Sequence, residues 1–257
     1  ESDDDYRQAL ADGWLPIRVW PVAGLWQVDW CWFGDRPLQQ PFFRDAVEDA
    51  LRLPFNQVFR RQTPLSALTQ WHRQSPGLAP SAFILHASRC GSTLISQMLA
   101  RLDDHIVVSE PPPLDALLRG ELPEAERRAA ISGLLSAYGQ RRRGIEQRLV
   151  IKLDAWNIGE WPLLQTCFPD TPWLFVYRDP LEIAVSHVRR PGMHMVPGML
   201  GDCVLDDGLP FAGREDFIAR RLGRLFEAGY IHCRDGSGLV VNYSELPEAM
   251  AGRLANF

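Results

Sequence analysis

The 257-residue chain lacks long hydrophobic runs, paired cysteines and an excess of positive charge. No apolar run approaches the roughly 18 to 20 residues that a membrane-spanning helix needs, so we expect no contact with a membrane. The five cysteines are odd in number and have neither disulfide nor zinc-site spacing, which indicates a reducing compartment. The formal net charge of −5 argues against general affinity for nucleic acid. Residues 1–5 are acidic and contain no apolar part of a secretion signal, so we expect a cytoplasmic protein.

Lysine is almost absent as well. Lys152 is the only lysine, and the other residues of permanent positive charge are arginines. Such a bias commonly reflects genome composition and carries no functional signal of its own. It does make the position of this one side-chain amine informative.

Two regions of the chain differ in composition. Residues 1–80 are rich in tryptophan and proline, and alternating apolar residues over 25–33 predict one or two short strands. Helical periodicity predicts short helices at 44–53 and 64–72. We interpret residues 1–80 as a small region whose aromatic side chains pack on a main domain formed by residues 81–257.

From residue 81 onward, β-branched runs alternate with helical periodicity. The pattern predicts strands at 82–86, 106–109, 148–152, 173–177 and 238–242. It predicts helices at 94–102, 124–140, 157–168, 180–188 and 214–230. Short apolar strands joined by helices are typical of a parallel sheet that is covered on both faces. We therefore predict an α/β fold with a central parallel sheet of about five strands flanked by helices.

The segment 86–93, His-Ala-Ser-Arg-Cys-Gly-Ser-Thr, lies between the first of these strands and a helix. Such a turn offers backbone N–H groups and a helix N-terminus to a phosphate. Compared with the nucleotide P-loop G-x-x-x-x-G-K-[ST], Gly91 and Thr93 match, but Ser92 stands in place of the lysine. The missing lysine disfavours ATP or GTP hydrolysis, while Arg89 offers a fork of hydrogen bonds to an anion. The alternative is a polar turn in which Ser or Thr caps the helix.

A second segment, 175–186, carries Arg178 at the end of a strand and Ser186 about two helical turns later. Ligands of open α/β sheets bind at this end of the strands. The two side chains could grip one phosphate, or Arg178 could simply pair with Asp179 or Glu182.

Together, these segments resemble the sulfotransferase superfamily that uses 3′-phosphoadenylyl sulfate (PAPS), closest in style to its bacterial and tyrosylprotein-type members. Residues 88–94 resemble its 5′-phosphosulfate loop, and Arg178-Asp-Pro followed by Ser186 resembles its 3′-phosphate motif. Residues 242–247 resemble its strand-end Y-x-x-L segment. The resemblance covers residues 81–257 and implies a P-loop three-layer fold, the donor PAPS, the product 3′,5′-adenosine bisphosphate and no metal. The donor-binding residues that it implies are Arg89, Cys90, Gly91, Ser92, Thr93, Arg178, Ser186 and Tyr243.

The resemblance also implies catalytic roles. Lys152 would neutralise the leaving oxygen with help from Arg89, and Glu110 would take the proton of an acceptor hydroxyl or amine. The alternatives are a surface lysine that reaches water and a glutamate that serves only as a helix N-terminal charge. Other members use a histidine base, for which His86, His105 and His194 are the candidates.

Two rival functions remain open at this point: a small-molecule kinase that uses Mg-ATP, and a non-catalytic nucleotide-binding protein of the same fold. The acceptor and the oligomeric state cannot be read from the sequence. The Gly- and Met-rich segment 192–199 could cover a substrate, and some of the N-terminal tryptophans could line an acceptor pocket.

Overall fold

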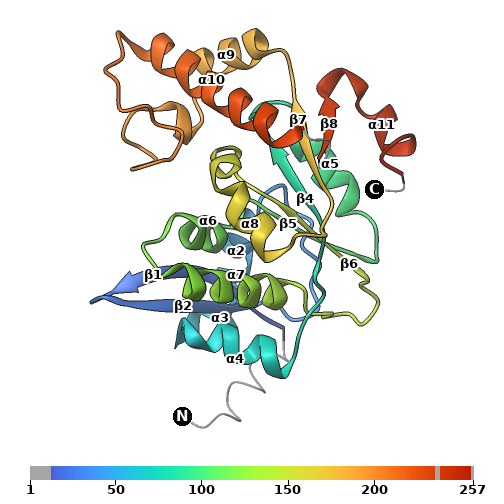
Figure 1. The fold of residues 1–257 in the computed structure, drawn as a ribbon. Helices are drawn as coiled ribbons and strands as arrows, with labels where there is room; N and C mark the ends of the chain where they lie inside the picture. The colour runs from blue at the N-terminus through green and yellow to red at the C-terminus, as the bar shows by residue number, and fades with distance from the viewer. Residues whose placement is uncertain (1–12, 235–237, 256–257) are drawn as a thin grey trace.

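The computed structural model describes residues 13–234 and 238–255 and contains two sheets (Figure 1). The larger sheet is parallel and has the order β5-β6-β4-β7-β8. Its strands are β4 (Pro80–His86), β5 (His105–Ser109), β6 (Arg148–Lys152), β7 (Trp173–Tyr177) and β8 (Leu239–Asn242). Most of their residues are buried because helices flank the sheet. The predicted α/β class, with a five-stranded parallel sheet in a three-layer, P-loop-like fold, is confirmed.

The predicted helices at 94–102, 124–140, 157–168, 180–188 and 214–230 are present with shifted ends, and further short helices lie between them and after β8. In chain order, the helices are α5 (Ser92–Leu99), α6 (Pro112–Arg119), α7 (Glu124–Tyr138), η1 (Ala155–Glu160), α8 (Trp161–Cys167), α9 (Pro180–Arg189), η2 (Met193–Met195), α10 (Arg214–Cys233), η3 (Tyr243–Glu245) and α11 (Glu248–Ala251). The chain leaves the central strand β4 toward β5 on one side, whereas β7 and β8 lie on the other side. This reversal of strand order creates a crevice at the carboxyl end of β4, where ligands of such sheets bind.

The N-terminal region forms a separate three-stranded antiparallel sheet, one strand more than predicted. Its elements are β1 (Trp14–Val22), β2 (Leu25–Trp32), α2 (Phe43–Leu51), α3 (Pro54–Val58), β3 (Arg61–Pro64) and α4 (Ser66–Gln74). Helix α4 packs closely on α7, since a Cβ added to Gly133 would lie 2.6 Å from the Leu68 carbonyl oxygen. The Tyr138 hydroxyl donates a hydrogen bond to the Pro16 carbonyl at 3.0 Å. The region therefore shares a buried core with the main sheet.

Two sequence-based expectations concern the environment of the protein. In the described part of the chain, no helix has both the length and the hydropathy to cross a bilayer. The prediction about a secretion signal rests on residues 1–5, which lie outside the described residues.

Candidate active site

A cleft of about 660 Å³ opens at the carboxyl ends of β4, β5 and β6. It brings together the phosphate-loop residues 88–93, Glu110 and the segment 190–194 that follows α9. The parallel register pairs Ser109 with Lys152, so Glu110 follows its strand beside the end of β6. The sheet therefore gathers the predicted catalytic residues at one edge.

The phosphate loop has an unusual backbone. Ser88, Arg89 and Gly91 have φ values of 66°, 48° and 85°, all in the left-handed region. Successive turns of this kind form a concave row of N–H groups that binds anions. Two of these residues are not glycine, and such strain persists mainly where a functional site needs it. Helix α5 starts after Gly91 without any side-chain cap, so the alternative of a Ser- or Thr-capped turn is wrong.

Both the positive φ of Gly91 and the close approach of Tyr243 require glycine at this position. A Cβ at this position would lie 2.6 Å from the Tyr243 ring. The Arg178 guanidinium lies over the same Tyr243 ring, 4.6 Å from its centre. Tyr243 thus connects the end of β7 with the phosphate loop. Because the Cys90 thiol donates to the Val176 carbonyl at 3.1 Å, only the backbone of Cys90 is available to a ligand.

Of the two side chains predicted to bind the second phosphate, Arg178 is already in an ion pair. Arg178 pairs with Glu182, as the alternative interpretation expected, whereas Asp179 caps the first turn of α9. Ser186 is half-buried on α9, and the structure shows no hydrogen bond between its side chain and Arg178 among the described residues. Neither Arg178 nor Ser186 lines the cleft itself.

Two buried histidines hold Ser88. His187 Nδ1 accepts the Gly192 N–H at 3.2 Å, so the ring proton lies on Nε2, which donates to Ser88 Oγ at 3.1 Å. Burial and the nearby Arg89 lower the pKa of His187 to about 4, so this ring is neutral at pH 7. On the other side, His86 Nδ1 accepts the Ser88 N–H at 3.1 Å. The hydroxyl hydrogen of Ser88 therefore remains free for a ligand in the cleft.

Lys152 is fully buried, with 0% of its surface exposed, so the alternative of a surface lysine is wrong. Its ammonium forms a hydrogen-bonded ion pair with Glu110 Oε1 and lies 5.2 Å from the Phe42 ring centre. A buried charge of this kind is tolerated only with a partner.

Glu110 accepts more than one donor. His86 Nε2 lies 3.3 Å from the same Oε1 atom that binds Lys152, and the Glu110 N–H donates to the Lys152 carbonyl at 2.7 Å. Burial by itself raises the pKa of Glu110, but the His86 hydrogen bond and the Lys152 ammonium outweigh it and lower the pKa to about 2. In this state Glu110 is a carboxylate with very weak basicity.

Asp154 is a second carboxyl group of the site, which sequence reasoning did not identify as functional. Burial and the nearby Glu110 and Asp115 raise its pKa well above the usual range. Its place two residues after Lys152 was the one available signal.

The three candidate histidine bases separate clearly. His105 is at the amino end of β5 and does not line the cleft, so its assignment as a base is wrong. His86 has both ring nitrogens engaged by Ser88, Leu153 and Glu110. His194 lines the cleft, and its Nε2 has no hydrogen-bond partner among the described residues. Burial, followed by the charge of His187, lowers the pKa of His194 to about 3.

The N-terminal region contributes Phe42 and Arg44 to the cleft, while none of its tryptophans lines it. The expectation that N-terminal tryptophans line a pocket is therefore wrong for this cleft. Trp156 also lines the cleft, and its indole N–H donates to Asp115 at 2.6 Å. Neither Phe42 nor Trp156 was identified from the sequence, because neither belongs to a motif that points to a site.

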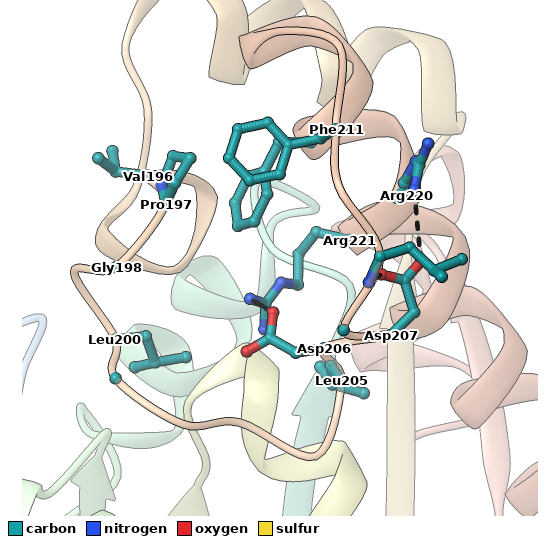
Figure 2. A pocket seen from close by; sticks show the side chains of 14 residues that line it. Val196, Pro197, Gly198, Leu200, Leu205, Asp206, Asp207, Phe211, Arg220 and Arg221 are labelled. Carbon is teal, nitrogen blue, oxygen red and sulfur yellow. Dashed lines mark hydrogen bonds and ion pairs between the residues drawn. The ribbon is translucent and has the colours of Figure 1, made fainter.

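A second cavity of about 230 Å³ lies between residues 196–211 and α10 (Figure 2). Its charged side chains are already paired: Asp206 with the buried Arg221, and Asp207 with Arg220. It shares no lining residue with the main cleft.

No family model matches the chain, and no curated protein matches it at a significant level.

Proposed function

We propose that the protein is a sulfotransferase that moves a sulfuryl group from PAPS to a hydroxyl or amine of an acceptor by in-line displacement. One observation carries the proposal: a buried Lys152–Glu110 pair lies at the sheet edge beside a left-handed, uncapped glycine loop. A cation, a carboxylate and a row of N–H dipoles are the groups that sulfuryl transfer needs.

The residues present fit such a donor. The left-handed backbone at Ser88, Arg89 and Gly91 suits a row of N–H groups to an anion, and the Arg89 side chain is exposed beside it. Arg178 and Ser186 are the groups for the 3′-phosphate, with Arg178 exchanging its exposed partner Glu182 for the phosphate. A bidentate arginine–phosphate contact is stronger than an exposed pair with a carboxylate.

When bound, PAPS supplies the sulfuryl group, whose bond to the 5′-phosphate oxygen breaks as a bond to the acceptor oxygen or nitrogen forms. Lys152 neutralises the charge that develops on the 5′-phosphate oxygen. Glu110 receives the acceptor proton. The hydroxyl of Ser88, held by His187, donates toward the same anionic group.

A thermal-shift titration tests this proposal. We expect 3′,5′-adenosine bisphosphate to stabilise the protein by about 2.7 kcal/mol at 100 times its dissociation constant, and Mg-ATP not to do so. Stabilisation by Mg-ATP alone would favour the kinase, and no response to either ligand would contradict a nucleotide donor site.

A further inference from the structure

The ion pair between Lys152 and Glu110 conflicts with the activity proposed for both residues. In the proposed reaction Lys152 contacts the donor and Glu110 contacts the acceptor, yet in the structure the two side chains bind each other. Glu110 Oε1 also receives His86 at 3.3 Å. A carboxylate bound by an ammonium and an imidazole accepts a further proton poorly.

Lys152 has the means to change partner. An ammonium has three N–H donors, and Glu110 is its one hydrogen-bond acceptor among the described residues. The side chain is a flexible stem, and its head lies beside the cleft under Phe42. An anionic oxygen that reaches this point therefore finds unsatisfied donors on a buried cation.

Glu110 keeps other neighbours after Lys152 changes partner, among them Asp154 and His86. Burial and the nearby Glu110 and Asp115 carboxyl groups raise the pKa of Asp154 well above its usual range, which disfavours a second negative charge beside Glu110. His86 Nε2, 3.3 Å from Glu110 Oε1, still holds this carboxylate in place without the charge of Lys152.

Resting on the proposed function, we propose that Lys152 keeps Glu110 inactive as a base until the donor's 5′-phosphate draws the ammonium away. Binding of the donor thus switches on the base. A base that is inactive without donor cannot deprotonate an acceptor that arrives first, so the productive order is donor before acceptor.

The charged groups around Glu110 determine whether its proton affinity rises or falls when Lys152 leaves. The groups that face it are Lys152 from β6, His86 from β4, Asp154 from the turn after β6, and His194 from η2. Asp115 from α6 acts on the neighbouring Asp154. Of these, Lys152 is the cation, and the histidines are neutral. Loss of its contact leaves the His86 hydrogen bond but removes the attraction of the ammonium, which also opposes the effect of burial, so the proton affinity of Glu110 rises.

Proton uptake on ligand binding measures this change without an acceptor. Calorimetric titrations with 3′,5′-adenosine bisphosphate in two buffers of different ionisation enthalpy give the number of protons bound. We expect uptake that increases as the pH is lowered from 7 to 5, is absent in Glu110→Gln, and persists in Asp154→Asn. Adenosine 3′-monophosphate, which lacks the 5′-phosphate, is the matched ligand and should give none.

Difference infrared spectroscopy of the wild-type protein provides a second readout if Glu110→Gln does not fold. Addition of the bisphosphate at pH 5 should produce a new band of a protonated carboxyl group. Binding without uptake and without this band would overturn the inference and leave the donor site intact. Uptake that survives in Glu110→Gln would also overturn it, whereas failure of the bisphosphate to bind would overturn the proposed function itself.

Discussion

Replacing Glu110 by glutamine should destabilise the protein far more than the loss of an ordinary ion pair. Lys152 is fully buried, and its ammonium would lose its charged partner. Removing one partner of a buried pair typically costs about 3–5 kcal/mol, because the remaining charge stays desolvated. At about 2–4 °C per kcal/mol for a chain of this size, the expected fall in melting temperature is roughly 6–20 °C.

The reciprocal change should cost less. In Lys152→Met the remaining Glu110 is 20% exposed and keeps the hydrogen bond from His86, so we expect a loss of about 1–3 kcal/mol. The double variant should recover part of the stability lost in Glu110→Gln, which gives a favourable coupling energy between the two side chains.

Chemical denaturation at pH 7 measures all three variants. Glu227→Gln is the control, because Glu227 belongs to an exposed pair with Arg224 at 3.0 Å and should lose less than about 1 kcal/mol. If Glu110→Gln and Glu227→Gln lose equal stability, Lys152 does not depend on Glu110 and the description of the site is wrong.

Three further predictions concern the loop, the second carboxyl and the histidines. Gly91→Ala should lower both stability and bisphosphate affinity more than Gly144→Ala. Both glycines have positive φ, but only at Gly91 would the new Cβ meet a ring. Equal effects of the two substitutions in denaturation and titration would contradict the packing against Tyr243. Asp154→Asn should leave stability at pH 7 unchanged or raised, because the raised pKa of Asp154 means that its charged form opposes folding. A large loss of stability in the same denaturation assay would contradict this prediction. The pKa of His187 is lowered from 6.5 to about 4, so the unfolded chain binds a proton there that the folded chain does not. Stability should therefore fall as the pH drops from about 6.5 to 4, with a shallower slope in His187→Gln, and an unchanged slope in that variant would refute the assignment.

Much of the fold could be predicted because the main sheet is regular. The predicted strand at 148–152 coincides with β6, and the one at 173–177 coincides with β7, since continuous apolar runs bounded by turns leave little ambiguity. Helix α6 was missed because it begins within a run of prolines, which local reasoning assigns to a loop. The strand β3 contains only four residues and ends in a proline, so its pairing with β2 decides its structure.

Only part of the candidate site could be predicted in its residues, and none of it in its contacts. Lys152 and Glu110 follow strands that are separated in sequence, and their meeting depends on the pairing of Ser109 with Lys152. The pKa of Glu110 depends on this contact, so the direction of its shift could not be read from the sequence. Phe42 reaches the cleft from a region whose packing no local pattern specifies.

The most direct test of the central claim is a calorimetric comparison of 3′,5′-adenosine bisphosphate with 5′-AMP on the wild-type protein and on Arg178→Met. We expect the bisphosphate to bind at least about tenfold more tightly than AMP, equivalent to about 1.4 kcal/mol, and the difference to disappear in the variant. Equal affinity for the two ligands in the wild-type protein would contradict a 3′-phosphate site at Arg178 and, with it, the assignment of PAPS as the donor.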